Sequence, residues 1–332
     1  MATLKDIAKI ANVNISTVSK ALRNSADLNE TTISSIQAIA DSLNYPYAAK
    51  MGGKKKNESL IGVIYPEIIS DYYANVLNSL QTHLKKDGMR MLMMMSGFSE
   101  EEEVVCLKQM MKCNVGAVVC FTERNDGGER FRKIIEKHNL LFLLVSMSDD
   151  GDFCDSICVD DWQSAVIAVE HLICLGHKEI AYVGDQLSET RRKAYESTLT
   201  EHGIEVRPEY IFESNLRFEE CGYMGMQQLL HCGKRFTGLF AAYDNIAIGA
   251  MRAIHEANLK IPQDISIVSI DDIRMARYLN VRLTTVTEPT QDLGELAANL
   301  LIMKIRGKWK TIQNIKLKPT LNIRETTAPP AG

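Results

Sequence analysis

Apolar residues recur at helical spacing close to the amino terminus and predict three short helices between Thr3 and Tyr45. Thr3 precedes the first helix and Asp6 lies three residues later, which resembles a capping box. A tight turn at residues 11–14 leads to a second helix, Ile15–Leu22, and a polar loop leads to the third. The apolar side chains expected to be buried are Leu4, Ile7, Ala8 and Ala11 in the first helix, Val18 and Leu22 in the second, and Ile33, Ile36, Ala40 and Leu43 in the third.

From Leu60 the pattern changes to short apolar runs that alternate with amphipathic helices. Strand–helix alternation over such a length predicts parallel sheets with helices on both faces. Two such series follow one another, so we expect an all-α head followed by an α/β body of two similar lobes. Ligands in this architecture bind at the carboxyl ends of the strands, here across a cleft. No Gly-x-Gly-x-x-Gly follows the first predicted strand and no Walker sequence occurs, so the sequence gives no support for nucleotide chemistry.

The first two predicted helices and their tight turn form a helix-turn-helix. Opposite its buried residues, the second helix exposes Ile15, Ser16, Ser19 and Lys20. Small hydroxyl side chains allow close approach to a phosphate backbone, and one cation suits a base edge in the major groove. This pattern favours DNA binding. The alternative is a small helical bundle whose second helix presents a solvated polar face.

The sequence TLKDIAKIANVNISTVSKALRNS, followed by LNETT and LNY, resembles the amino terminus of the lactose/galactose repressor family. This resemblance implies that Thr3, Thr17 and Ser19 contact phosphates, and that Asn24 ends the recognition helix. It also implies that base edges in the major groove are read by Ile15, Ser16 and Lys20. The expected head is a helix-turn-helix domain at residues 1–46.

Residues 47–59 are expected to link the head to the body. Gly52-Gly53 and the run Lys54–Lys56 mark a tether that is flexible when free, and the lysines would gain from nearby phosphates. By the resemblance, this linker becomes a hinge helix that wedges into the minor groove of the operator, with contacts from Ala49, Lys50 and Met51. The two glycines weaken such a helix by about 1 kcal/mol each.

The resemblance extends over the body, through motifs such as Val159-Asp160-Asp161 and Ile270-Asp271-Asp272. It implies a periplasmic-binding-protein-like body at residues 60–327 and three crossings between the lobes. The N-lobe would comprise about 60–159 and 289–316, and the C-lobe about 160–288 and 317–327. Residues 328–332 are expected to form a disordered tail. The family pattern further implies a homodimer, or a higher oligomer, on a palindromic operator.

Seven residues are expected to bind an effector in the cleft. By the resemblance, Asp271 matches a carboxylate of the C-lobe and Arg191 matches an arginine of the cleft. Tyr72 and Tyr73 stand where the family has paired aromatics. The alternatives are a buried ion pair for Asp271 and Arg191, and packing at a helix start for the tyrosines.

Three of the seven depart from the family pattern. Tyr243 stands where an asparagine is usual, Ser146 where an aspartate is usual, and Arg217 where an aromatic is common. Losing an acceptor and gaining a cation shifts the expected ligand toward anions. We therefore hypothesise an acidic or phosphorylated sugar, or a related anion, as the effector.

The distribution of charge and the spacing of the cysteines indicate which partners and which cellular compartment to expect. Residues 1–57 hold eight Lys and Arg against four Asp and Glu, so 8 − 4 = +4, and the remainder is −4 − 4 = −8. A basic head on an acidic body suits nucleic-acid contact at one end only. The eight cysteines include no Cys-x-x-Cys pair, so we expect buried thiols and no metal. Without a signal peptide or a long apolar span, we expect a cytoplasmic protein that contacts no membrane.

These features predict a sequence-specific transcriptional repressor that is controlled by a carbohydrate-related small molecule and needs no cofactor. An alternative is a regulator whose body responds to a protein partner, as occurs in part of the family. A third possibility, an enzyme, requires a nucleophile–base pair or a metal cluster, and the sequence offers neither. The operator, the effector and the direction of its effect cannot be named from the sequence.

Overall fold

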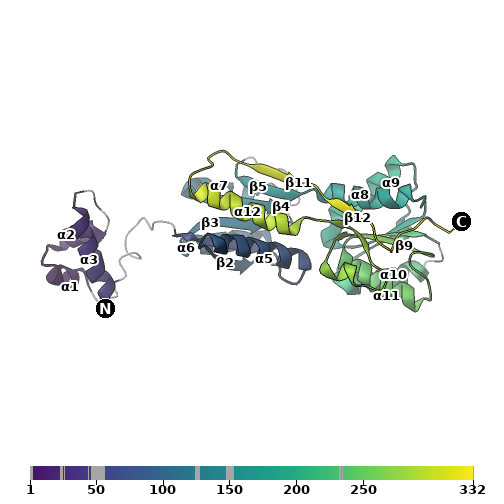
Figure 1. The fold of residues 1–332 in the computed structure, drawn as a ribbon, viewed down its shortest axis with the longest axis horizontal. Coiled ribbons are helices and arrows are strands. Elements are labelled where there is room, and N and C mark those ends of the chain that lie inside the picture. The colour runs from purple at the N-terminus through teal and green to yellow at the C-terminus, as the bar shows by residue number, and fades with distance from the viewer. Residues whose placement is uncertain are drawn as a thin grey trace. The chain divides into compact units, whose positions relative to one another are not determined.

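The computed structural model describes residues 3–22, 25, 27–43, 45, 57–123, 128–146, 153–231, 233 and 235–331. The chain divides into two compact units, Met1–Asn57 and Glu58–Gly332, and each is considered by itself (Figure 1). Asn24, Ala49, Lys50 and Met51, and with them most of the expected hinge, lie outside the described residues. No helix in the described ranges is long and apolar enough to cross a membrane.

The first unit holds α1 (Leu4–Ile10), α2 (Ile15–Leu22) and α3 (Glu30–Ser42). Asp6 Oδ2 accepts hydrogen bonds from the backbone N–H and the hydroxyl of Thr3, at 2.8 and 2.7 Å, and so closes the start of α1. Asn12 adopts a left-handed φ of 50° in the turn between α1 and α2, a conformation that asparagine tolerates. Each helix supplies side chains to one small core, chiefly Ile7, Val18, Ala21, Ile36 and Ala40.

The second unit contains two six-stranded sheets. The first sheet has the order β11-β5-β4-β3-β1-β2, and we call the part built on it the first lobe. Its strands are β1 (Asn57–Tyr65), β2 (Arg90–Met95), β3 (Val115–Phe121), β4 (Leu141–Ser146), β5 (Asp155–Val159) and β11 (Asn314–Leu317). Its helices are α5 (Asp71–Lys86), α6 (Glu100–Lys112), α7 (Glu129–His138) and α12 (Thr290–Ile305).

The second sheet has the order β12-β10-β9-β8-β6-β7 and forms the second lobe. Its strands are β6 (Ile180–Asp185), β7 (Ile211–Ser214), β8 (Gly238–Ala241), β9 (Ser266–Asp271), β10 (Thr284–Thr287) and β12 (Thr320–Asn322). Its helices are α8 (Asp161–Cys174), α9 (Glu189–Glu201), α10 (Phe218–His231) and α11 (Asp244–Glu256). The predicted fold class, a helix-turn-helix head with a two-lobed α/β body, is confirmed.

The chain passes between the two sheets after β5, after β10 and again between β11 and β12 (Figure 1). Among the strand pairs that the described residues register, β12 runs antiparallel to β10 and the others are parallel. Parallel strands place their carboxyl ends at one edge of each sheet. The loops that leave β1, β3, β6, β8 and β9 can therefore meet in a single cleft.

Close helix pairs stabilise each lobe, and glycines make the approach possible. In the first lobe, a Cβ on Gly294 of α12 would lie 2.6 Å from the Val76 carbonyl oxygen of α5. In the second, a Cβ on Gly222 of α10 would lie 1.9 Å from the Ile246 carbonyl oxygen of α11. Neither contact leaves room for a larger residue unless the helices separate.

The expectation of a disordered tail is wrong for the described residues from Ala328 onward. The Ala328 carbonyl accepts hydrogen bonds from His177 Nε2 and Ser266 Oγ, both at 2.9 Å, and its N–H donates to Ser266 Oγ at 3.0 Å. Burial lowers the pKa of His177, which suits a neutral ring that donates from Nε2. Composition suggested a tail without structure, but these backbone groups have partners on the second lobe.

Candidate functional site

The exposed face of α2 presents the residues that the sequence assigned to base reading. Ile15, Ser16 and Lys20 are exposed, whereas Val18 of the same helix is fully buried. Thr17 and Ser19 are half-buried at the flanks of this face, and Thr3 is exposed at the start of α1. Lys20 Nζ lies 3.0 Å from Asp27 Oδ2, so the lysine is paired within the head. The helix thus offers an exposed face with one cation, one hydroxyl and one apolar side chain, and two half-buried hydroxyls lie at its flanks.

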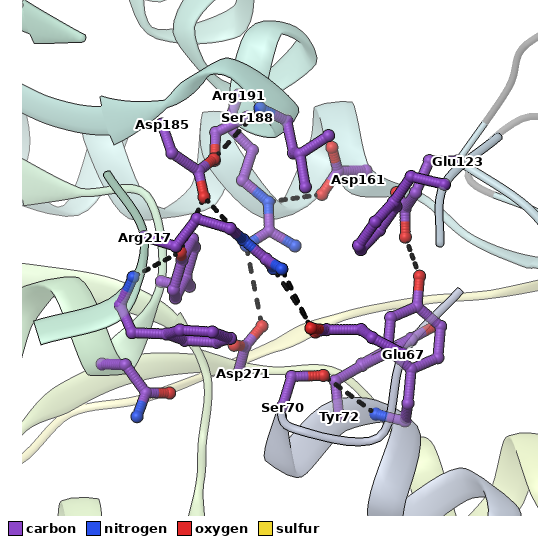
Figure 2. A pocket seen from close by; sticks show the side chains of 16 residues that line it. Glu67, Ser70, Tyr72, Glu123, Asp161, Asp185, Ser188, Arg191, Arg217 and Asp271 are labelled. Carbon is purple, nitrogen blue, oxygen red and sulfur yellow. Dashed lines mark hydrogen bonds and ion pairs between the residues drawn. The ribbon is translucent and has the colours of Figure 1, made fainter. Parts of the chain in front are cut away.

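A cleft between the two lobes collects six of the seven predicted effector residues: Tyr72, Tyr73, Arg191, Arg217, Tyr243 and Asp271. Figure 2 shows four of them, Tyr72, Arg191, Arg217 and Asp271, converging from both lobes. The seventh, Ser146, lies at the end of β4 in an adjoining small cavity, which it shares with Tyr72, Tyr73 and Glu123. Ser146 is therefore separate from the cleft proper.

Arg191, near the start of α9, is the buried centre of the second-lobe side of the cleft. Its Nε lies 2.6 Å from Asp161 Oδ1 and its Nη2 lies 3.2 Å from Glu288 Oε1. Its Nη1 donates to the Ala242 carbonyl at 2.8 Å and lies 3.6 Å from Asp271 Oδ1. One guanidinium thus faces three carboxylates. The sequence alternative of a buried ion pair for Arg191 and Asp271 is therefore present as part of a larger cluster.

The excess of carboxylates around Arg191 perturbs their protonation. Burial raises the pKa of Asp271 well above its usual value, and neighbouring carboxylates add to the shift although Arg191 opposes it. Burial likewise raises the pKa of Glu288 to about 7. The cluster therefore holds protons near neutral pH that separate carboxylic acids would have released.

Asp271 also has an unusual backbone, with a φ of 112°, and Asp272 follows at 54°. Non-glycine residues in this region are strained, and the surrounding structure has to hold them. Asp272 provides that support, since its carboxylate accepts hydrogen bonds from Arg277 Nη2 at 2.8 Å and Asn322 Nδ2 at 3.0 Å. The strain and its support fix the Asp271 carboxylate at the edge of the cleft.

The paired tyrosines at the start of α5 form the opposite wall. Tyr72 and Tyr73 meet edge to face with ring centroids 5.1 Å apart, and Tyr73 also packs against Phe121. The Tyr73 hydroxyl donates a short hydrogen bond to Glu123, which follows β3. The tyrosines therefore combine helix-start packing, the sequence alternative, with a place on the cleft wall.

Tyr243 and Arg217 are held by acidic partners. The Tyr243 hydroxyl donates to Asp185 Oδ2 at 2.7 Å and accepts from the Phe218 N–H at 3.0 Å. Arg217 Nη1 lies 2.9 Å from Glu67 Oε2, and Arg217 Nε lies 3.5 Å from Asp185 Oδ2. Both side chains are therefore paired with carboxylates of the cleft.

The structure argues against the anionic effector expected from the sequence. Two guanidiniums line the cleft, those of Arg191 and Arg217, against five carboxylates: Glu67, Glu123, Asp161, Asp185 and Asp271. Carboxyl groups thus outnumber guanidiniums in this lining, and although burial raises the pKa of Asp271, the lining does not favour an anion. The sequence reasoning counted the added arginine without knowing which acidic side chains would surround it.

Sequence reasoning missed most of these carboxylates, although a signal was present. Glu67 and Glu123 follow β1 and β3 by two residues, and Asp185 ends β6. Acidic residues at strand carboxyl ends meet in the cleft of this architecture. Glu288, which directly follows β10, carries the same signal, whereas Phe98 and Phe218 follow no strand directly and carry none. No group of three or more His, Cys, Asp or Glu that could hold a metal ion occurs among the residues that the structure describes.

Comparison with known proteins gives two family matches. Residues 3–46 match the model described as bacterial regulatory proteins, lacI family, and residues 169–327 match the periplasmic binding protein-like domain. The ribose operon repressor of Haemophilus influenzae is 31% identical over 335 residues, covering 98% of each chain. The HTH-type transcriptional repressor PurR of Erwinia tasmaniensis is 30% identical over 336 residues, covering 99% of this chain and 97% of that protein.

A solved structure shares the fold over nearly the whole chain. The lac repressor dimer bound to operator and the anti-inducer ONPF has a TM-score of 0.73 at 24% identity. The match covers 98% of this chain and 99% of that one. At this identity the likeness concerns the fold alone.

Proposed function

This chain belongs to the lacI family of bacterial regulatory proteins and is a ligand-controlled DNA-binding regulator; from that premise, we propose that it represses transcription at a palindromic operator. The observation that supports this best is the exposed face of α2, with Ile15, Ser16 and Lys20, on a head whose core is closed behind it. The relatives at 30% identity or more are named as repressors of a ribose operon and as PurR.

In this proposal α2 enters the major groove. Lys20 leaves Asp27 and donates to a base edge, Ser16 hydrogen-bonds a neighbouring base, and Ile15 contacts a thymine methyl or sugar. Thr3, Thr17 and Ser19 contact phosphates and set the register of the helix on the duplex. Asn24, Ala49, Lys50 and Met51 would extend these contacts at the end of α2 and in the minor groove.

We further propose that two copies act together, because an operator with two-fold symmetry needs two heads. The lac repressor structure with the same fold is described as a dimer on its operator. A cytoplasmic location follows from the proposal, since that is where bacterial operators lie.

The cleft would control the head by changing how the two lobes are held. Three chain crossings connect the lobes, and residues from both line the cleft. A small molecule that binds one arrangement of the lobes better than another shifts the population toward it. A coupling of about 1–3 kcal/mol is enough for a roughly 5–150-fold change in operator affinity.

Control by a protein partner, the alternative raised from the sequence, has no support in the comparisons. The relatives are named as a ribose operon repressor and as PurR, and the cleft has the lining residues of a small-molecule site. The same relatives are named as repressors and not as enzymes.

Selection of bound duplexes from a random DNA pool tests the proposal. We expect a two-fold symmetric site, and weaker, less selective binding by Lys20→Ala and Ser16→Ala at equal salt concentration. Each lost base contact should cost about 1–3 kcal/mol. Lys137→Ala, which removes an exposed lysine from α7 of the body, is the matched control and should bind as the parent does. Equal affinity and selectivity of all three variants would refute the proposed role of α2.

A further inference from the structure

Arg217 bridges the two lobes across the cleft. It lies directly before α10 of the second lobe, and its main partner, Glu67, follows β1 of the first lobe. The contact uses both carboxylate oxygens, with Nη1 2.9 Å from Oε2 and Nη2 3.4 Å from Oε1. On its other side, Arg217 Nε lies 3.5 Å from Asp185 Oδ2 in the second lobe. Figure 2 shows the Arg217 side chain extending across the cleft toward Glu67.

Two aromatic rings complete the surroundings of this guanidinium. Its central carbon lies 5.1 Å from the ring centroid of Phe98 in the first lobe and 4.5 Å from that of Phe218 in the second. A cation over an aromatic face is attracted at these distances. Both phenylalanines have left-handed backbones, with φ of 64° and 56°. Because such conformations are strained outside glycine, they indicate that the surrounding structure holds both rings in place.

Together, Glu67, Asp185, Phe98 and Phe218 form a cation cage, and Arg217 fills it. The two carboxylates are buried, since the side chains of Glu67 and Asp185 are 8% and 2% exposed. Burial tends to lower the pKa of Arg217, but the hydrogen bond and charge of Glu67 raise it overall, so the guanidinium stays charged. A neutral molecule that pushed Arg217 aside would leave two buried carboxylates without a countercharge, which is strongly unfavourable.

Arg217 fits its cage incompletely. Its buried Nε makes no hydrogen bond with any residue that the structure describes. The cavity that remains in the cleft is about 80 Å³, whereas small-molecule pockets typically measure roughly 300–1,000 Å³. The cleft is therefore largely filled by the protein's own side chains, and a ligand gains space by moving Arg217.

We propose that Arg217 is a built-in substitute for the ligand, and that the effector is a small molecule with an amino or guanidino group that takes its place in the cation cage. The remaining lining supports this class, because Glu123, Asp161 and Asp271 outnumber Arg191 and can accept hydrogen bonds from a cationic or hydroxyl-rich ligand. This inference rests on the proposed function, in which the cleft is the effector site.

The test removes the built-in cation and supplies a free one. Full-length Arg217→Ala is titrated calorimetrically with ethylguanidinium and with ethylurea, which has a similar shape but no charge. We expect Arg217→Ala to bind ethylguanidinium at least tenfold more tightly than the parent does, and at least tenfold more tightly than it binds ethylurea. Adding Glu67→Gln to Arg217→Ala should remove most of this binding.

The matched control is Arg192→Ala. Arg192 pairs with Glu196 and Glu213 inside the second lobe, so its loss should not create a site for ethylguanidinium. Circular dichroism and the melting temperature establish that each variant is folded. If folded Arg217→Ala binds ethylguanidinium no better than the parent, or binds ethylurea equally well, the proposal is overturned.

The last measurement separates this inference from the proposed function. The selected operator is titrated with the Arg217→Ala protein, with and without ethylguanidinium. We expect ethylguanidinium to change the affinity of this variant for the operator by at least fivefold. If bound ethylguanidinium does not change the operator affinity, the effector role of the cage is refuted, and DNA binding by the head is unaffected by that result. A parent protein that selects no operator refutes the proposed function instead.

Discussion

Replacing Glu288 with glutamine should stabilise the body at alkaline pH and leave it unchanged under mildly acidic conditions. Glu288 is 2% exposed, and its Oε1 lies 3.2 Å from Arg191 Nη2. Its Oε2 is buried without a hydrogen-bond partner among the described residues. The carboxylate is therefore desolvated and shares the Arg191 cation with Asp161 and Asp271. Glutamine keeps the shape of this side chain and removes its charge.

The magnitude follows from the pKa. Burial raises the pKa of Glu288 from 4.5 to about 7. At about 1.4 kcal/mol per unit, this difference corresponds to roughly 3 kcal/mol. Between these pH values the folded chain binds more protons than the unfolded chain, so the free energy of unfolding falls as pH rises. The contribution is fully present below pH 4.5 and is lost as the pH passes about 7.

Thermal unfolding of the parent and of Glu288→Gln between pH 5 and pH 8 measures this effect. At pH 8 we expect the variant to be more stable by about 1–3 kcal/mol, because it avoids the buried charge. For a unit of this size, each kcal/mol raises the melting temperature by roughly 2–4 °C. The difference should shrink toward zero at pH 5. Glu136→Gln, at an exposed position on α7, is the control and should follow the parent throughout.

Two outcomes would refute this reasoning. A variant that is less stable than the parent by the same amount at pH 5 and pH 8 would mean that Glu288 is ionised in the folded state and pairs favourably with Arg191. A variant that matches the parent at every pH would mean that the buried charge has no net cost.

Three further predictions concern other parts of the chain. Ile7→Ala opens a cavity in the small core of the head and should lower the free energy of unfolding of the head by about 2–5 kcal/mol. DNA binding should then be lost, while calorimetry shows the unfolding transition of the body unchanged. A retained operator affinity would contradict this. Gly222→Ala places a Cβ against the Ile246 carbonyl and should lower the stability of the body by about 1–3 kcal/mol or more. Urea unfolding measures this loss, and an unchanged midpoint would show that α10 and α11 can separate freely. Asp27→Asn removes the carboxylate that lies 3.0 Å from Lys20 Nζ. Because one acidic side chain leaves the DNA-facing surface, operator affinity in a binding titration should rise severalfold. Weaker binding would mean that Asp27 positions Lys20 for DNA.

Local patterns were enough to predict the head. Helical spacing placed Ile7, Val18 and Ile36 in one core, and the same spacing left Ile15, Ser16 and Lys20 on the opposite face of α2. These relations join residues three or four apart in one helix, so the sequence contains them directly. Alternation of strands and helices likewise predicted the two-lobed α/β body, because each element shows its own period.

The chemistry of the cleft depended on contacts that no local pattern records. Arg217 was expected to attract an anion, yet it pairs with Glu67, 150 residues earlier in the chain. Arg191 meets Glu288 across 97 residues. Whether a cavity attracts cations or anions depends on the sum of charges from several strand ends, and only the folded chain decides which of them come together. The sequence alone therefore determined the helices of the head and the two lobes of the body. The tertiary structure decided the charge of the cleft, because that charge is set by partners distant in sequence.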